Sequence, residues 1–140
     1  MTSSTEPRRA ETRSITIDAT PDVVLDIITD PTTLPGRAPE FARGGVSADG
    51  GVWIVDTIAG QARFRLRISR EAGTVDLLAE KQPAVGERGT FSRVIPNGSG
   101  SEYLLTLLFG PAMSDEAIGR QMGHIEKELA RVKEMAEAVG

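Results

Sequence analysis

The last third of the chain decides its fold: Val94–Phe109 (VIPNGSGSEYLLTLLF) leads into a long segment that begins near Ser114. Asn97-Gly98 is a turn pair between two runs rich in strand-forming residues, which predicts a β-hairpin. After Ser114, apolar residues recur at alternating intervals of four and three, the spacing of one helix face. They are Ile118, Met122, Ile125, Leu129, Val132, Ala136 and Val139. Together these features predict a sheet that grips one long helix around an interior pocket.

The predicted C-terminal helix has an ordinary start and two unusual residues. Ser114 is the N-cap candidate, and the acids after it suit the positive end of the helix dipole. Gly119 and Gly123 are out of place in a helix, where each costs about 1 kcal/mol relative to alanine. We interpret them as sites of close approach to another element or as space left for a ligand. A coiled-coil dimer is the alternative use of the apolar stripe.

The remaining elements follow from local patterns. Ser14–Asp18 alternates as a strand, and Thr20 followed by Pro21 predicts the start of a helix. Asp30-Pro31 ends that helix and caps a second short one that reaches Leu34, after which Pro35 and Gly36 predict a loop. Strands are predicted over 41–48, 52–58, 62–70, 74–80, 89–95 and 102–109, with a loop over 81–88.

Composition limits the class of protein. A chain of 140 residues with 39% hydrophobic residues predicts one domain, which we place at 13–140 after a disordered leader over 1–12. The formal net charge of −4 argues against a nucleic-acid partner. The chain has no cysteine, which excludes disulfides and thiolate chemistry. No apolar run is long enough for a membrane span and no signal peptide is visible, so we expect a cytoplasmic protein.

Several stretches resemble the SRPBCC superfamily, the START-like group that includes polyketide cyclases and lipid-transfer proteins. Residues 14–24 (SITIDATPDVV) look like the opening strand and helix of that superfamily, and residues 30–35 (DPTTLP) look like its second short helix. Residues 94–102 and 111–116 (PAMSDE) are similar to the end of short bacterial members. Many relatives carry an aromatic residue soon after the Leu-Pro step, where this chain has Gly36-Arg37.

The resemblance implies an α+β helix-grip fold. In that fold a seven-stranded antiparallel sheet curves around the long C-terminal helix, and two short helices follow the first strand. A cavity lies between sheet and helix. The resemblance does not imply one reaction, because the same fold serves carriers, cyclases and receptors. We therefore expect either binding of a small hydrophobic molecule, lipid-like or polyketide-like, or an aromatase/cyclase acting on a poly-β-ketone. Either a monomer or a homodimer fits.

Candidate ligand-binding residues come from the apolar strand faces and from the helix. Trp53 and Tyr103 are the only Trp and Tyr, and each fits either plain core filling or a pocket wall. Met122 suits varied ligands because its side chain is adaptable. The full predicted set is Trp53, Phe64, Leu66, Tyr103, Leu105, Gly119, Met122 and Gly123.

A basic stripe occupies one predicted strand. Arg63, Arg65 and Arg67 alternate with apolar residues, so one strand face is basic and the other is apolar. We interpret the basic face as the solvated convex side of the sheet, because buried unpaired arginine is costly. A cationic pocket for a carboxylated ligand is the alternative.

Catalytic and metal chemistry have little support in the sequence. The chain has one histidine, His124, which lies to one side of the helix stripe near Gln121 and Glu128. It is either a boundary residue or, like the Tyr103 hydroxyl, a polar aid at the pocket. Without a ligand cluster or a nucleophile turn, we predict no metal, no cofactor and no catalytic residue, and leave open whether the chain is an enzyme.

Overall fold

The computed structural model describes residues 7–80 and 89–139. Its strands are β1 (Arg9–Ile17), β2 (Gly45–Asp49), β3 (Val52–Thr57), β4 (Gly60–Ser69), β5 (Thr74–Ala79), β6 (Gly89–Asn97) and β7 (Gly100–Phe109). Its helices are α1 (Pro21–Ile28), the 3₁₀ helix η1 (Pro31–Thr33), α2 (Leu34–Arg37) and α3 (Asp115–Val139). The predicted loop 81–88 and residues 1–6 of the predicted leader lie outside the described residues.

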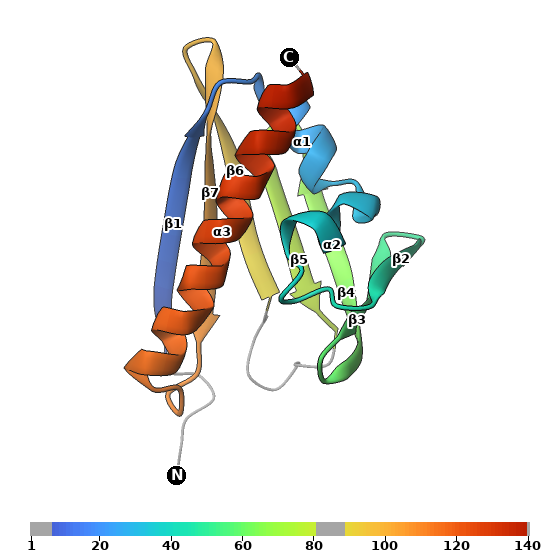
Figure 1. The fold of residues 1–140 in the computed structure, drawn as a ribbon, viewed down its shortest axis with the longest axis vertical. Coiled ribbons are helices and arrows are strands. Elements are labelled where there is room, and N and C mark those ends of the chain that lie inside the picture. Colours follow the sequence, from blue (N-terminus) through green and yellow to red (C-terminus); the bar gives the residue numbers. More distant parts are fainter. Residues whose placement is uncertain (1–6, 81–88, 140) are drawn as a thin grey trace.

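The strands form one antiparallel seven-stranded sheet in the order β1-β7-β6-β5-β4-β3-β2. β2 to β7 follow one another as neighbours, and β1 closes the order by pairing with β7. The predicted hairpin is confirmed: Asn97 faces Gly100 in the β6–β7 register, and Gly98 has φ +58°. Figure 1 shows α3 lying across the sheet, with α1 and α2 beside it. The predicted α+β helix-grip architecture is therefore confirmed.

The first strand begins earlier than predicted. Arg9–Thr12 pair with Phe109–Thr106 of β7, so these four residues belong to the sheet and the prediction of a disordered leader is wrong for them. This part of the strand has no alternating hydrophobic pattern, because its polar side chains form ion pairs. Arg9 contacts Glu11 and Asp115, and Arg13 contacts Glu126 on α3.

The segment after α1 also differs from the prediction. The first helix starts as expected, with the Thr20 hydroxyl accepting a hydrogen bond from Val23 N and Pro21 in the first turn. Pro35 and Gly36 were expected in a loop but lie within α2. Proline is tolerated there because a first-turn N–H has no helical acceptor. Gly36 suits close packing, since a Cβ at this position would lie 3.3 Å from Met135 Cε of α3.

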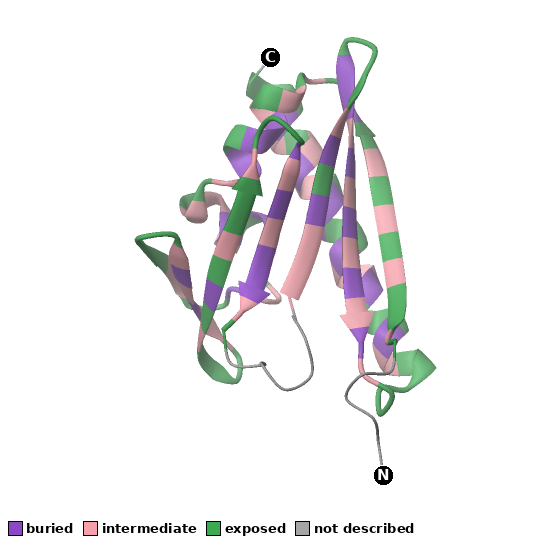
Figure 2. Cartoon of the chain, turned by 180° about the vertical axis from the view of Figure 1, so that it is seen from behind, coloured by how far each residue is buried: buried purple, intermediate pink, exposed green. Residues whose placement is uncertain are grey.

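The apolar stripe of α3 forms the main core with the sheet and α1. Ile118, Met122, Ile125, Leu129, Val132 and Ala136 are all buried, whereas the last predicted member, Val139, is 67% exposed. The stripe therefore packs against the sheet of the same chain, as predicted, and not in a coiled-coil dimer. Along β7, seen from behind in Figure 2, buried and half-buried residues alternate. A second, smaller core around Trp53, Val55 and Phe64 lies on the same face of the sheet, over β3 and β4.

Candidate ligand-binding site

Three hollows adjoin one another between the sheet, α3 and the segment around α2. The inner one has a volume of about 40 Å³, which is room for roughly two or three ordered waters. The two outer hollows have volumes of about 360 and 520 Å³. Phe41 and Glu128 line all three. These two residues therefore mark the point at which the hollows meet.

Six of the residues singled out in the sequence lie around these hollows. Trp53, Leu66, Tyr103 and Leu105 line the inner hollow. Phe64 lines the 360 Å³ hollow, together with Leu107, Phe109 and Ile125. His124 lines the 520 Å³ hollow beside Glu40 and Arg43. The apolar faces of β3, β4 and β7 and one flank of α3 thus meet, as a pocket requires.

Three predicted residues lie elsewhere. Met122 is only 1% exposed and packs in the main core, and neither Gly119 nor Gly123 borders the three hollows. A Cβ at either glycine would meet no heavy atom within 4 Å, so close packing does not explain them either. Gly119 and Gly123 share a face of α3 with Glu126, because residues three and four apart are neighbours on a helix. Glu126 accepts a hydrogen bond from Arg13 of β1, so this face of α3 is the one nearest β1.

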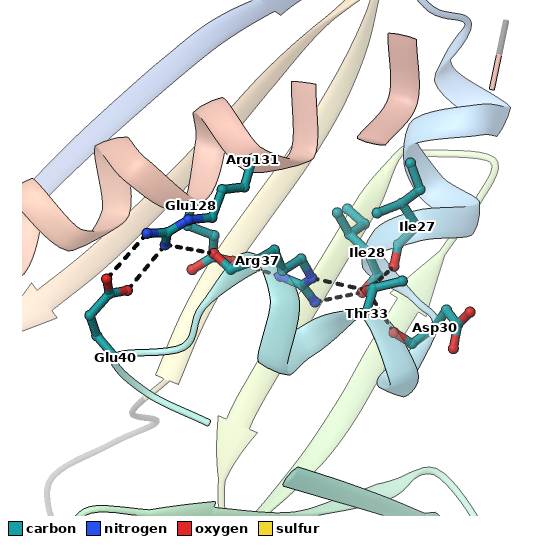
Figure 3. A network of polar contacts seen from close by, with 8 residues as sticks. All are labelled: Ile27, Ile28, Asp30, Thr33, Arg37, Glu40, Glu128 and Arg131. Carbon is teal, nitrogen blue, oxygen red and sulfur yellow. Dashed lines mark hydrogen bonds and ion pairs between the residues drawn. The ribbon is translucent and has the colours of Figure 1, made fainter. Parts of the chain in front are cut away.

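A buried ion pair forms the polar end of the inner hollow. Arg37 Nη1 donates to Glu128 Oε2 at 2.6 Å, and the two side chains are 6% and 10% exposed. Arg37 also donates from Nη2 to the Ile28 carbonyl at 3.2 Å and from Nε to Thr33 Oγ1 at 3.3 Å. Figure 3 shows Arg37 reaching from α2 toward both α1 and α3. Each guanidinium nitrogen therefore has a protein acceptor.

The local sequence explains why Arg37 is held so firmly. Asp30 Oδ1 accepts hydrogen bonds from Thr32 N and Thr32 Oγ1, which fixes the start of η1. Thr33 Oγ1 donates to the carbonyls of Ile27 and Asp30, at 2.8 and 2.9 Å, and so ties the end of η1 back to α1. The same hydroxyl oxygen accepts from Arg37. The turn chemistry of Asp30–Thr33 thus positions the guanidinium.

Burial dominates the electrostatics at this end of the site. It raises the pKa of the Glu128 carboxyl, and the attraction and hydrogen bond of Arg37 only partly oppose it. Burial, followed by the negative charge of Glu128, raises the pKa of Tyr103 to about 12. The Tyr103 phenol therefore keeps its proton at neutral pH. A carboxylate and a phenol, an acceptor and a donor, converge here on one small volume.

A second ion pair lies closer to solvent. Arg131 Nη1 and Nη2 contact the two carboxylate oxygens of Glu40 at 3.2 and 3.3 Å, and Nη1 also donates to the Arg37 carbonyl at 3.3 Å. The hydrogen bond from Arg131 lowers the pKa of Glu40. These contacts, also visible in Figure 3, hold the segment after α2 against α3 at the edge of the 520 Å³ hollow.

The basic stripe of β4 faces away from the hollows. Phe64 and Leu66 line them, and the alternating arginines therefore point to the opposite face of the sheet. Arg63 pairs with Glu80 and Arg67 with Asp76, and all three arginines are exposed. The structure supports the solvated-face interpretation and not a cationic pocket.

No protein-family model matches the sequence, and no curated protein is significantly similar to it. Solved structures are similar in fold. A START superfamily protein from Mycobacterium smegmatis is 12% identical, with a TM-score of 0.67 over 94% of this chain and 99% of that one. The di-domain ARO/CYC BexL from the BE-7585A biosynthetic pathway is 18% identical, with a TM-score of 0.71 over 92% of this chain and 46% of that one. The Aha1 dimer from Colwellia psychrerythraea is 12% identical, with a TM-score of 0.71 over 92% and 96%.

The chain shares the helix-grip fold with these solved structures. These identities are low, so the likeness concerns the fold. The described residues contain no group of three or more His, Asp or Glu side chains placed to hold a metal ion. None of the helices over residues 7–80 and 89–139 is both long and apolar enough to cross a membrane.

The sequence did not predict a role in the ligand site for Arg37 or Glu128, whose ion pair forms the polar end of the inner hollow. Arg37 was noted only as a departure from the aromatic residue of many relatives. Glu128 follows Ile125 by three residues and precedes Leu129, so a charged residue at the edge of the apolar stripe was the available signal. The pairing itself has no local signal, because 91 residues separate the partners.

Proposed function

We propose that this chain binds a small, mainly hydrophobic molecule, lipid-like or polyketide-like, between the sheet and α3. The observation that carries the proposal is the pair of outer hollows of about 360 and 520 Å³ that meet at Phe41 and Glu128. Ligand pockets commonly have volumes of about 300–1,000 Å³ and are mainly apolar with a few polar groups. Leu77, Leu107 and Ile125 supply apolar walls here, and Glu128 supplies a polar end.

A titration with 1-decanol tests the proposal, using thermal unfolding and calorimetry. A ligand that binds only the folded state raises stability in proportion to the logarithm of its concentration over Kd. Thr90 lines both the inner and the 360 Å³ hollow, so Thr90→Phe should fill the space and weaken binding about tenfold or more. Thr74→Phe is the matched control, because Thr74 alternates with Val75 and faces away from the hollows.

The proposal predicts saturable stabilisation of the wild type and of Thr74→Phe, with a clear loss in Thr90→Phe. If decanol stabilises none of the three proteins, the binding function is wrong. If Thr90→Phe binds as well as the control, the ligand lies elsewhere.

A cyclase is the second candidate, and the polar end of the inner hollow favours it. Glu128, Tyr103 and Ser92 converge there on a space next to the larger hollows. A carboxylate can take a proton from carbon during enolisation of a poly-β-ketone, and a protonated phenol can donate to a ketone oxygen. Incubation with a short poly-β-ketone mimic separates the two functions. A carrier returns the mimic unchanged, whereas a cyclase forms a ring product at a rate that Tyr103→Phe and Glu128→Gln both reduce.

A further inference from the structure

The Glu128 carboxylate has one oxygen in use and one available. Oε2 accepts from Arg37, but no described residue donates to Oε1. Oε1 is also not among the fully enclosed side-chain atoms without a partner, so it borders open space. Because Glu128 lines all three hollows, that open space is the proposed ligand site.

The positive charge of Arg37 is not available in the same way. Its three guanidinium nitrogens donate to Glu128, Ile28 and Thr33, and its side chain is 6% exposed. Arg131 is likewise engaged by Glu40 and by the Arg37 carbonyl. A ligand that reaches the inner hollow therefore meets an acceptor oxygen of a carboxylate, while Arg37, the one described cation that lines this hollow, is already engaged. Arg43 lines the 520 Å³ hollow and not the inner one.

The other polar side chains that line the inner hollow are three hydroxyls and the indole of Trp53. The hydroxyls are those of Tyr103, Ser92 and Thr90. Hydroxyls can satisfy a ligand that donates to Glu128, but they do not neutralise a second negative charge. Arg37 balances the one negative charge of Glu128, so a second carboxylate beside Oε1 would repel Glu128 without a cation of its own in the inner hollow, as far as the described lining goes.

We propose that the site selects an apolar ligand with an uncharged hydroxyl group at its inner end, which donates a hydrogen bond to Glu128 Oε1, and that it rejects ligands with a carboxylate there. This inference rests on the proposed binding function and names the ligand class for it. Glu128 is the residue that determines the selection.

The test compares 1-decanol with decanoate, which share the chain and differ at the head group. Both are titrated at about pH 7.5, where a simple carboxylic acid is ionised. The wild type should bind the alcohol at least about tenfold more tightly than the acid. Glu128→Gln keeps an oxygen that can accept from Arg37 but removes the negative charge, so the alcohol-to-acid ratio should fall about tenfold.

Glu134→Gln on the exposed side of α3 is the control for the change in net charge. It should keep the wild-type ratio, which separates the local effect of Glu128 from the different hydrophobicity of the two probes. Circular dichroism and the unfolding midpoint of each variant establish that it is folded before binding is measured.

The outcomes are distinguishable. If neither probe binds, the proposed function fails and the inference falls with it. If both bind and Glu128→Gln leaves their ratio unchanged, the binding function stands and the selection by Glu128 is overturned.

Discussion

Arg37 Nη1 and Glu128 Oε2 lie 2.6 Å apart, although 91 residues separate them in the chain. Their contact fastens α2 to α3 at the polar end of the inner hollow, and both side chains are almost fully buried. A buried pair of this kind is easy to damage by removing one partner, because the remaining charge is left without compensation. The same contact also leaves one Glu128 oxygen toward the ligand site. A substitution in this pair should therefore affect both the stability of the fold and ligand binding.

Removing one member of the pair should destabilise the fold more than removing both. We expect Arg37→Met to lower the free energy of unfolding by about 3–5 kcal/mol, because Glu128 stays buried and unpaired. The double variant Arg37→Met/Glu128→Leu should lose less than Arg37→Met alone, since no buried charge remains. Urea unfolding of the wild type, both single variants and the double variant measures this coupling. Losses that simply add would contradict the importance of the pair.

The pKa of Glu128 predicts a specific pH dependence of stability. Burial raises this pKa above its ordinary value of 4.5, so the folded state holds the Glu128 proton more tightly than the unfolded state does. The resulting stabilisation is fully present below about pH 4.5 and is lost as pH rises through the raised pKa of the folded state. The difference in unfolding free energy between the wild type and Glu128→Gln should therefore fall as pH rises from 4.5 toward neutral. A constant or rising difference would refute the direction of the shift.

The buried stripe of α3 predicts a contrast between two neighbouring positions. Leu129 is 2% exposed in the main core, so Leu129→Ala should cost about 2–5 kcal/mol. Lys133 makes partly exposed contacts with Glu137 and the Thr16 carbonyl, and Lys133→Ala should cost under about 1 kcal/mol. Urea melts of both variants provide the comparison. Equal losses would show that the stripe is assigned to the wrong helix face.

The early start of β1 predicts that its first residues contribute to stability. Deletion of residues 1–12 removes Arg9–Thr12, which pair with β7, whereas deletion of residues 1–8 leaves them in place. Each lost ladder hydrogen bond is worth about 0.5–1.5 kcal/mol, so the longer deletion should be less stable than the shorter by about 1–3 kcal/mol. Thermal unfolding of both truncated proteins tests this. Identical unfolding midpoints would show that Arg9–Thr12 do not contribute to stability.

Local patterns predicted the elements whose signals are local. The Asn97-Gly98 turn, the alternation of β3 to β7 and the four-and-three spacing of α3 all follow from chain geometry. The start of β1 was missed because its residues are polar and gain their partners from α3 and β7. α2 was missed because Pro35 and Gly36 usually break helices, but here they lie against α3.

The candidate site could be predicted only in its apolar part. Strand alternation placed Trp53, Leu66 and Tyr103 on faces that proved to line the inner hollow. The glycines of α3 offered missing volume, but sequence alone could not say which side of the helix that volume faces. The Arg37–Glu128 pair depends on tertiary packing between distant segments, and no spacing rule connects the two residues.

The most direct test of the central claim is a methyl NMR titration of the folded protein with 1-decanol. We predict that the methyl signals of Leu105, Leu107 and Ile125, which line the hollows, shift or broaden saturably. Those of Leu104 and Ile54, which alternate onto the opposite face of the sheet, should stay in place. Saturable shifts confined to Leu104 and Ile54, or no saturable shifts at all, would contradict a ligand site between the sheet and α3.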